Sequence, residues 1–211
     1  IIRQMERQGK VLRFFEEEGI DLEVDVGNGA DKCMTAVISG NADVALCGTE
    51  AAIYVHAEGR EDVPIVFAQL TQRAGNFLVA REPIDNFSWD MVKNTTILGG
   101  RAGGMPEMVF EYILKKNGID PQADLTIDQS INFGLTAAAF TSDDADYTVE
   151  FEPFATTLES EGSGSVVASL GTESGYVPYT AYCARKSYME KNPELIQKFT
   201  NAIQMGLNKH H

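Results

Sequence analysis

The sequence predicts an α/β fold of two lobes that close on each other like a clamshell. Helix-forming and strand-forming segments alternate through residues 2–68, which is typical of α/β units with crossover helices. A second α/β region follows, and the chain enters it through an extended segment at 72–77 and leaves it through another at 176–184. We therefore expect residues 1–73 and 181–211 to form lobe 1 and residues 74–180 to form lobe 2, with function in the cleft between them.

The bulk composition is that of a soluble globular protein with room for two cores. The chain has 211 residues, of which 44% are hydrophobic and 23% are charged. A net charge of −14 argues against nucleic acid or an anionic membrane surface as the partner.

The cysteines and histidines do not predict a metal site. Cys33, Cys47 and Cys183 have no C-x-x-C spacing, and Cys33 and Cys47 lie in apolar contexts typical of buried thiols. Of the three histidines, His56 lies on a predicted helix, and His210 and His211 close the chain like the remnant of a purification tag.

Lobe 1 is predicted to be a parallel sheet with helices on both faces. Its alternation begins with an amphipathic helix that ends at Gly19 and a half-exposed strand of alternating apolar and acidic residues. The predicted helices are 2–18, 31–38 and one starting at 49, and the predicted strands are 20–26, 44–47 and 64–68.

Lobe 2 is predicted from shorter segments, and a long helix at 193–207 then returns to lobe 1. The region at 146–150 leads into Phe151 and a Glu-Pro pair. The predicted strands are 77–80, 95–98, 124–127 and 165–169, and the predicted helical segments are 88–93, 107–116, 134–140 and 154–161.

The central motif is a strand, a tight turn and a helix start at residues 44–50. Gly48 ends the strand, Thr49 is a suitable N-cap, and Glu50 suits the first helical turn, where free N–H groups favour negative charge. In an open α/β sheet such a turn lies at the carboxyl edge, where ligands bind. The alternative interpretation is a capped helix with no ligand.

A second turn of the same kind, at residues 99–105, strengthens the prediction of a ligand site. Its glycines allow close approach of main chain to a ligand, and two facing helix N-termini bind an anion without any lysine. Arg101 is either a bidentate ligand to an anionic group or a solvated loop charge. The spacing fits neither the Walker nor the dinucleotide pattern.

Glu50 favours a different ligand chemistry. A carboxylate in the cleft repels an anion and suits an amine, an amidine or a ring N–H donor, unless it serves only to stabilise its own helix. We expect Glu152 rather than Glu150 to face the cleft, because Glu150 alternates with Val149 and points outward. A sulfonate-like or nitrate-like anion and an aminopyrimidine-like molecule both remain open.

Polar and aromatic residues near the crossings are candidates for orienting a small planar ligand: Gln72, Asn76, Asn132, Phe133 and Tyr179. Aromatic residues are more often part of a core than of a site. The complete predicted set of ligand-binding residues, with no catalytic residue, metal ligand or cofactor, is Gly48, Thr49, Glu50, Gln72, Asn76, Arg101, Gly104, Met105, Asn132 and Glu152.

Three separated stretches resemble a known family. Residues 14–24, residues 39–45 with the following Gly48, and residues 151–155 are similar to solute-binding proteins of ABC importers of the nitrate/sulfonate/taurine type, which include carriers of thiamine-pyrimidine precursors. The resemblance implies a two-lobed periplasmic-binding-protein-like (type II) clamshell. Relative to that family the chain looks truncated at both ends, and it has Phe151 where many members have Trp.

The resemblance also implies a function. It predicts an extracytoplasmic solute-binding protein, lipid-anchored through a segment outside this chain, that captures a small polar molecule and delivers it to an ABC permease without chemical conversion. Two other functions stay open: an enzyme that uses Glu50 and Glu152 as an acid/base pair, and a ligand-sensing domain of a transcription regulator. The lack of Ser-His and Cys-His pairings argues against nucleophilic catalysis.

Overall fold

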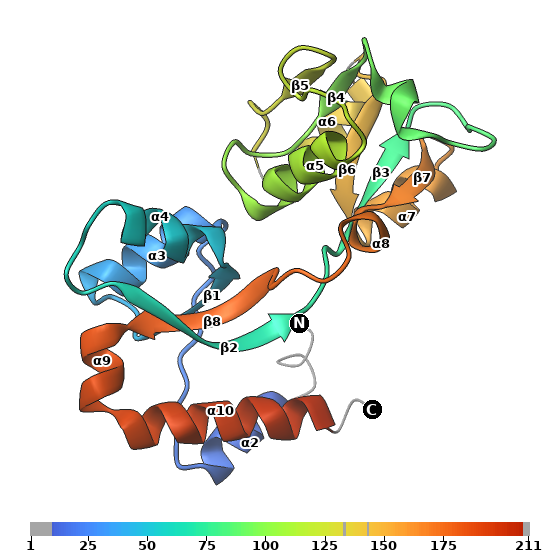
Figure 1. The fold of residues 1–211 in the computed structure, drawn as a ribbon. Helices are drawn as coiled ribbons and strands as arrows, with labels where there is room; N and C mark the ends of the chain where they lie inside the picture. Colours follow the sequence, from blue (N-terminus) through green and yellow to red (C-terminus); the bar gives the residue numbers. More distant parts are fainter. Residues whose placement is uncertain (1–9, 133, 143, 209–211) are drawn as a thin grey trace.

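The computed structural model describes residues 10–132, 134–142 and 144–208, and within them the chain forms two α/β lobes (Figure 1). Two adjacent crossings, 72–75 and 175–179, connect the lobes. The crossings are hydrogen-bonded to each other, because the Val177 N–H donates to the Gln72 carbonyl across 2.9 Å. The lobe boundaries at 73/74 and 180/181 stay a prediction. Phe133, His210, His211 and the start of the helix predicted at 2–18 lie outside the described residues.

The sheet of lobe 1 has the strand order β1-β8-β2, and β8 is antiparallel to both of its neighbours. The predicted parallel sheet is therefore wrong. Strands β1 and β2 do point in the same direction, but the strand that returns from lobe 2 lies between them and runs the opposite way. The bounds are β1 (Val44–Gly48), β2 (Pro64–Thr71) and β8 (Thr180–Arg185).

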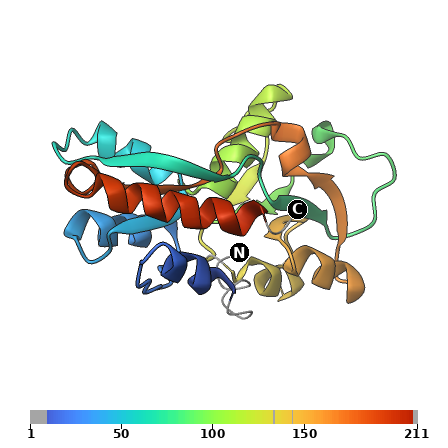
Figure 2. The same cartoon turned by 90° about the horizontal axis from the view of Figure 1, so that it is seen from below.

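Helices cover both faces of this sheet, as the sequence predicts. Ala45 and Cys47 of β1 pack with α3 and α4, whereas Val44 and Leu46 pack on the opposite face with α2 and α10. Seen from below, α10 runs lengthwise over lobe 1 toward lobe 2 (Figure 2). The bounds are α2 (Lys10–Glu17), α3 (Ala30–Ser39), α4 (Glu50–Ala57), α9 (Lys186–Lys191) and α10 (Pro193–Asn208).

The strand predicted at 20–26 is absent, and this prediction is wrong. Helix α2 ends as expected at Gly19, whose φ of 74° lets the Ile20 N–H reach the Phe15 carbonyl across 2.8 Å. The following segment has the alternating pattern of a strand, but among the described residues no strand pairs with it. Without a neighbour to complete its hydrogen bonds, the pattern alone does not make a strand.

Lobe 2 contains a sheet of order β5-β4-β6-β3-β7. Strand β4 is parallel to β5 and β6, and β3 is antiparallel to β6 and β7. The bounds of the strands are β3 (Asn76–Ala80), β4 (Thr96–Leu98), β5 (Thr126–Asp128), β6 (Tyr147–Phe151) and β7 (Ser165–Ser169).

This sheet also has a core on each face. Leu78 and Ile97 pack with α5 and α8, and Val79 and Leu98 pack with α6 and α7 on the other side. The short helices α8 and α9 were not predicted, because segments this short show no helical periodicity. The bounds are η1 (Trp89–Val92), α5 (Met105–Lys116), α6 (Thr136–Ser142), α7 (Phe154–Ser160) and α8 (Leu170–Ser174).

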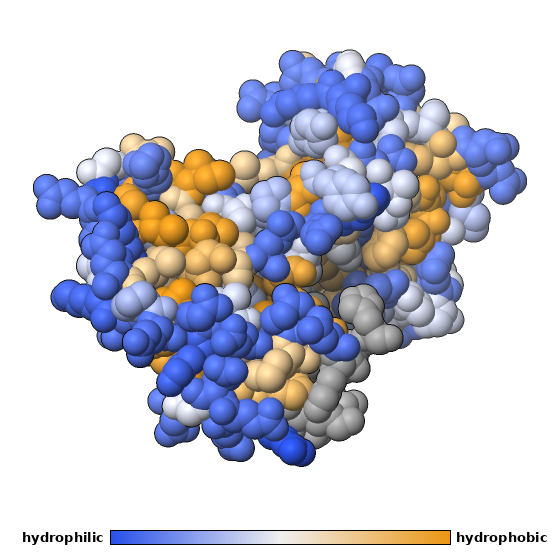
Figure 3. Space-filling view, turned by 60° about the horizontal axis from the view of Figure 1, so that its bottom comes forward, coloured by the Kyte–Doolittle hydropathy of each residue, from blue (hydrophilic) through white to orange (hydrophobic). Residues whose placement is uncertain are grey.

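Hydrophilic residues form most of the rim of the molecule, and hydrophobic residues gather on the body of lobe 1 in the same view (Figure 3). Within the described residues, no helix has both the length and the apolar character needed to cross a membrane.

Candidate functional site

The two lobes meet where α4 of lobe 1 faces the 99–104 turn and the start of α5 in lobe 2. The Met105 N–H donates to the Glu50 Oε1 across 3.2 Å, and the Tyr54 hydroxyl donates to the Gly103 carbonyl across 3.2 Å. Arg101 of the same turn forms an ion pair with Asp31 of α3, with 2.6 Å between Nη1 and Oδ1. These contacts bring together Glu50, Arg101, Gly104 and Met105 of the predicted site residues.

Glu50 is enclosed by the two lobes, with 3% of its surface exposed. Its Oε2 has no hydrogen-bond partner among the described residues. A Cβ at Gly48 would collide with this carboxyl group, so the glycine leaves the space that Glu50 fills. Burial raises the pKa of the Glu50 carboxyl, and the Met105 N–H and the Arg101 charge oppose that effect only in part. The site therefore holds an acidic group that lacks a strong partner.

Two further buried polar side chains lie at the hinge. Asn76 is fully buried at the start of β3, and neither atom of its amide has a hydrogen-bond partner among the described residues. The Tyr179 hydroxyl likewise has none, and burial together with the charge of Glu50 raises the pKa of Tyr179. Phe151 connects the two, because it pairs with Asn76 in the sheet and its ring centroid lies 6.5 Å from that of Tyr179.

We call Glu50, Asn76 and Tyr179 the hinge cluster. Unsatisfied buried polar groups each cost about 1–3 kcal/mol, so native proteins rarely keep them unless another molecule supplies the missing hydrogen bonds. The hinge cluster offers acceptor and donor atoms at the start of α4 and beside the two crossings, and the Glu50 charge acts on the Tyr179 phenol. Of its three members the predicted set includes Glu50 and Asn76, and Tyr179 was named as an orienting candidate.

The 99–104 turn is held from within lobe 2 by Glu107. The Gly103 N–H donates to Glu107 Oε2 across 3.2 Å, and Gln129 Nε2 donates to Glu107 Oε1 across 2.8 Å. Burial, followed by the adjacent Glu111, raises the pKa of Glu107 to about 7. The sequence analysis did not single out Glu107. Its place three residues after the N-cap Gly104 is a capping signal that could have identified it.

Thr49 does not cap helix α4 with its side chain, so that part of the prediction is wrong. Its backbone is already helical, and its hydroxyl donates to the Pro178 carbonyl across 2.8 Å. The residue therefore ties the start of α4 to the second crossing. Gln72 lies at the first crossing, where its side chain is exposed and its carbonyl accepts the Val177 N–H.

The predicted orientation of the two glutamates on β6 and after it is also wrong. Glu150 is buried, with 3% of its surface exposed, and accepts the Thr148 hydroxyl across 2.7 Å. Glu152 is exposed and accepts the Thr156 N–H and hydroxyl at the start of α7. Alternation failed as a guide because both faces of the sheet are covered. Burial raises the pKa of Glu150.

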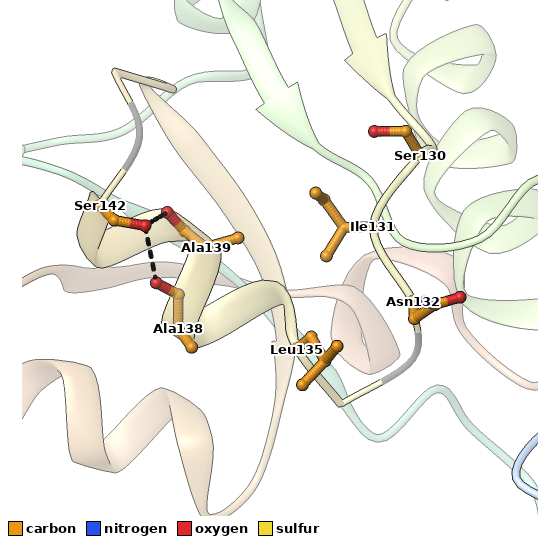
Figure 4. Close-up of a pocket in the computed structure, with 7 residues that line it drawn as sticks. All are labelled: Ser130, Ile131, Asn132, Leu135, Ala138, Ala139 and Ser142. Atoms are coloured by element: carbon orange, nitrogen blue, oxygen red, sulfur yellow. Dashed lines mark hydrogen bonds between the residues drawn. The ribbon is translucent and has the colours of Figure 1, made fainter.

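Asn132 lines an open pocket of about 430 Å³ in lobe 2, between the segment that follows β5 and helix α6 (Figure 4). The Ser142 hydroxyl at its edge bonds to the carbonyls of Ala138 and Ala139. None of the hinge cluster lines this pocket. The lining residues are Ser130, Ile131, Asn132, Leu135, Ala138, Ala139 and Ser142.

The described residues contain no group of three or more His, Cys, Asp or Glu side chains suited to hold a metal ion. Cys33, Cys47 and Cys183 are free thiols in or against one apolar cluster of lobe 1.

A model of the NMT1-like family matches residues 9–206. YtlA of Bacillus subtilis (strain 168), which is described as a binding protein, is 50% identical to this chain over 190 residues. That match covers 90% of this chain and 57% of YtlA, so the chain spans little more than half the length of this relative.

Solved structures share the fold. The alkanesulfonate-binding protein SsuA from Xanthomonas axonopodis pv. citri, bound to MOPS, matches with a TM-score of 0.77 and 15% identity, over 96% of this chain and 68% of SsuA. The periplasmic nitrate-binding protein NrtA from Synechocystis PCC 6803 matches with a TM-score of 0.71 and 15% identity, over 92% of this chain and 56% of NrtA. The chain thus has the two-lobed periplasmic-binding-protein fold.

Proposed function

The chain belongs to the NMT1-like family, and from this premise we propose that it is the ligand-capturing part of a solute-binding protein for an ABC importer. It closes two lobes over a small polar molecule and passes the molecule to a membrane permease. It works outside the cytoplasm, held at the membrane by a lipid anchor. The relatives whose names state a role are binding proteins, which supports binding without catalysis.

The observation that carries this proposal is the hinge cluster. Glu50, Asn76 and Tyr179 hold buried polar atoms that lack partners among the described residues, and all three lie where the lobes meet. A captured ligand would supply the missing hydrogen bonds and so draw the lobes together.

The chemistry of the cluster favours a ligand that donates hydrogen bonds. Glu50 Oε2 is an acceptor when ionised, and an N–H donor such as an amine, an amidine or an aminopyrimidine would form a charge-assisted bond with it. The Asn76 amide can both donate and accept, which suits a planar ring with adjacent donor and acceptor atoms. The names of SsuA and NrtA state that those proteins bind an alkanesulfonate and nitrate. In this chain the buried carboxyl group of Glu50 disfavours the binding of such anions.

Isothermal titration against alkanesulfonates, nitrate, bicarbonate, amines and aminopyrimidines tests the proposal. We expect an N–H donor to bind and Asn76→Ala to weaken binding at least tenfold. Asn201→Ala on the exposed side of α10 is the matched control and should bind as the wild type does. Silence across the panel would contradict solute capture, and binding of anions alone would contradict the ligand class.

A further inference from the structure

The start of α5 already has a carboxyl group bound to it, and the carboxyl group comes from the opposite lobe. Helix α5 is twelve residues long and begins after Gly104, which gives it no side-chain cap. The positive end of such a helix attracts carboxylates, phosphates and sulfonates. Here the first N–H of the helix, that of Met105, bonds to Glu50 Oε1 across 3.2 Å.

The surroundings of Glu50 are built for this position. The carboxyl group is 3% exposed, and the absent Cβ of Gly48 makes room for it. The Tyr179 phenol, on which the Glu50 charge acts, and the Asn76 amide beside the first crossing also hold buried polar atoms without partners among the described residues.

We propose that Glu50 is a built-in anion that fills the anion position between the lobes and so selects against free anionic ligands. The inference rests on the proposed function in placing the ligand at the hinge cluster. A carboxylate, sulfonate or nitrate group arriving there meets an occupied helix end and a carboxyl group of like charge. A donor group meets Glu50 Oε2, which is still available. One side chain therefore closes the lobes with one oxygen and sets ligand choice with the other.

The charged neighbours agree with this role. Arg101 acts on Glu50 through its charge and not through a hydrogen bond, because its guanidinium is paired with Asp31. Tyr54 and Tyr179 are neutral at physiological pH, because burial, and after it the charge of Glu50, raises the pKa of each phenol. Within the opposite lobe, the group that stabilises the Glu50 carboxylate most is the Met105 N–H at the start of α5. Removing the Glu50 carboxyl group frees this N–H for another anion, because Glu107 bonds to the Gly103 N–H and not to that of Met105.

The experiment is to remove Glu50 and supply anions from solution. We expect Glu50→Ala to bind acetate and methanesulfonate at least tenfold more tightly than the wild type in isothermal titration. If Glu50→Ala does not fold, Glu50→Ser replaces it in the experiment. Serine keeps a polar group in the first turn, and we expect the same gain in anion affinity. Glu50→Gln fills the same space and should not gain it. Glu58→Ala changes an exposed glutamate beyond the other end of α4 and is the matched control.

Small-angle scattering provides a second readout. The folded Glu50→Ala chain should be more open than the wild type, and acetate should return its radius of gyration to the wild-type value. The inference is overturned if the wild type binds methanesulfonate as well as the variants do, or if folded Glu50→Ala and Glu50→Ser gain no anion affinity. These outcomes need no natural ligand, so they are distinguishable from a failure of the proposed function.

Discussion

Asp31 of lobe 1 and Arg101 of lobe 2 form an ion pair across the junction of the lobes, with 2.6 Å between their charged atoms. Arg101 was predicted as a ligand residue or a solvated charge, and the structure places it against helix α3. Its partner explains why the turn at 99–104 lies close to lobe 1. The pair is partly open to solvent, because the Arg101 side chain is 36% exposed and the Asp31 side chain is 52% exposed.

Asp31→Asn should therefore cost less than about 1 kcal/mol of unfolding free energy, because solvent screens a pair this exposed. The loss should shrink further at about 1 M salt, where charges are screened within a few ångströms. Urea unfolding at low and high salt measures both effects, and scattering at low salt should show a more open chain. Asp90→Asn, which breaks the Lys93 pair inside lobe 2, should leave the opening of the lobes unchanged.

Gly48→Ala should destabilise the closed form, because the added methyl group overlaps the Glu50 carboxyl. Overpacking of this kind costs about 1–3 kcal/mol, measurable by thermal or urea unfolding. Gly75→Ala is the control, since its Cβ would meet the Phe151 ring at 3.8 Å, an ordinary contact. Equal effects of the two substitutions would contradict the proposed crowding at Glu50.

The stability of the chain should fall as the pH rises through neutrality, and Glu107 should cause part of that fall. Its pKa is raised to about 7 from 4.5, so the folded state keeps a proton that the unfolded state has lost. Its contribution is complete below about pH 4.5 and is lost as the pH rises through about 7. Glu107→Gln should become more stable relative to the wild type between pH 5 and pH 8, by on the order of 1–3 kcal/mol.

Denaturant unfolding at several pH values measures this difference for Glu107→Gln. Glu16→Gln, on the exposed side of α2, should show none. A wild-type and Glu107→Gln pair whose stabilities run parallel over that range would rule out the assignment.

Two buried polar residues of the lobe 2 sheet should differ in how their substitution changes the unfolding free energy. Asn76→Leu removes an amide without partners and should hold or raise the unfolding free energy by about 1 kcal/mol while it abolishes ligand binding. Thr148→Val removes the hydroxyl that donates to Glu150 and should cost about 1–3 kcal/mol. Unfolding and titration of both variants test this, and a large stability loss for Asn76→Leu would give that residue a structural role.

Strands β3, β4, β5 and β7 of lobe 2 were predictable because each is a short run of β-branched and apolar residues between turn residues, as at 165–169. The central strand β6 was not predicted as a strand. The direction and order of the strands were not predictable either. They depend on contacts between segments far apart in the chain, such as the pairing of Ala45 with Cys183. The sequence signal at 20–26 was genuine, but a strand also needs a neighbour.

In the candidate site, too, the features set by local sequence patterns were predictable and those set by contacts between distant segments were not. The turns at Gly48 and at 99–104 follow from local glycine and capping patterns, and the structure brings these two turns together at Glu50 and Met105. The orientation of Glu150 could not be inferred from alternation, because the helices on each side of the sheet leave neither face to solvent. Thr49 found a nonlocal acceptor at Pro178, which no local pattern reveals.

The central position of β8 sets an order for biosynthesis. The elements of lobe 2 from β3 to α8 form one uninterrupted stretch, so a nascent polypeptide can complete them before residue 180 emerges from the ribosome. Strands β1 and β2 emerge from the ribosome earlier but have to wait for β8 to hydrogen-bond between them. The half that is made first should therefore be the last to fold, and it is the half most exposed to chaperones and proteases during synthesis.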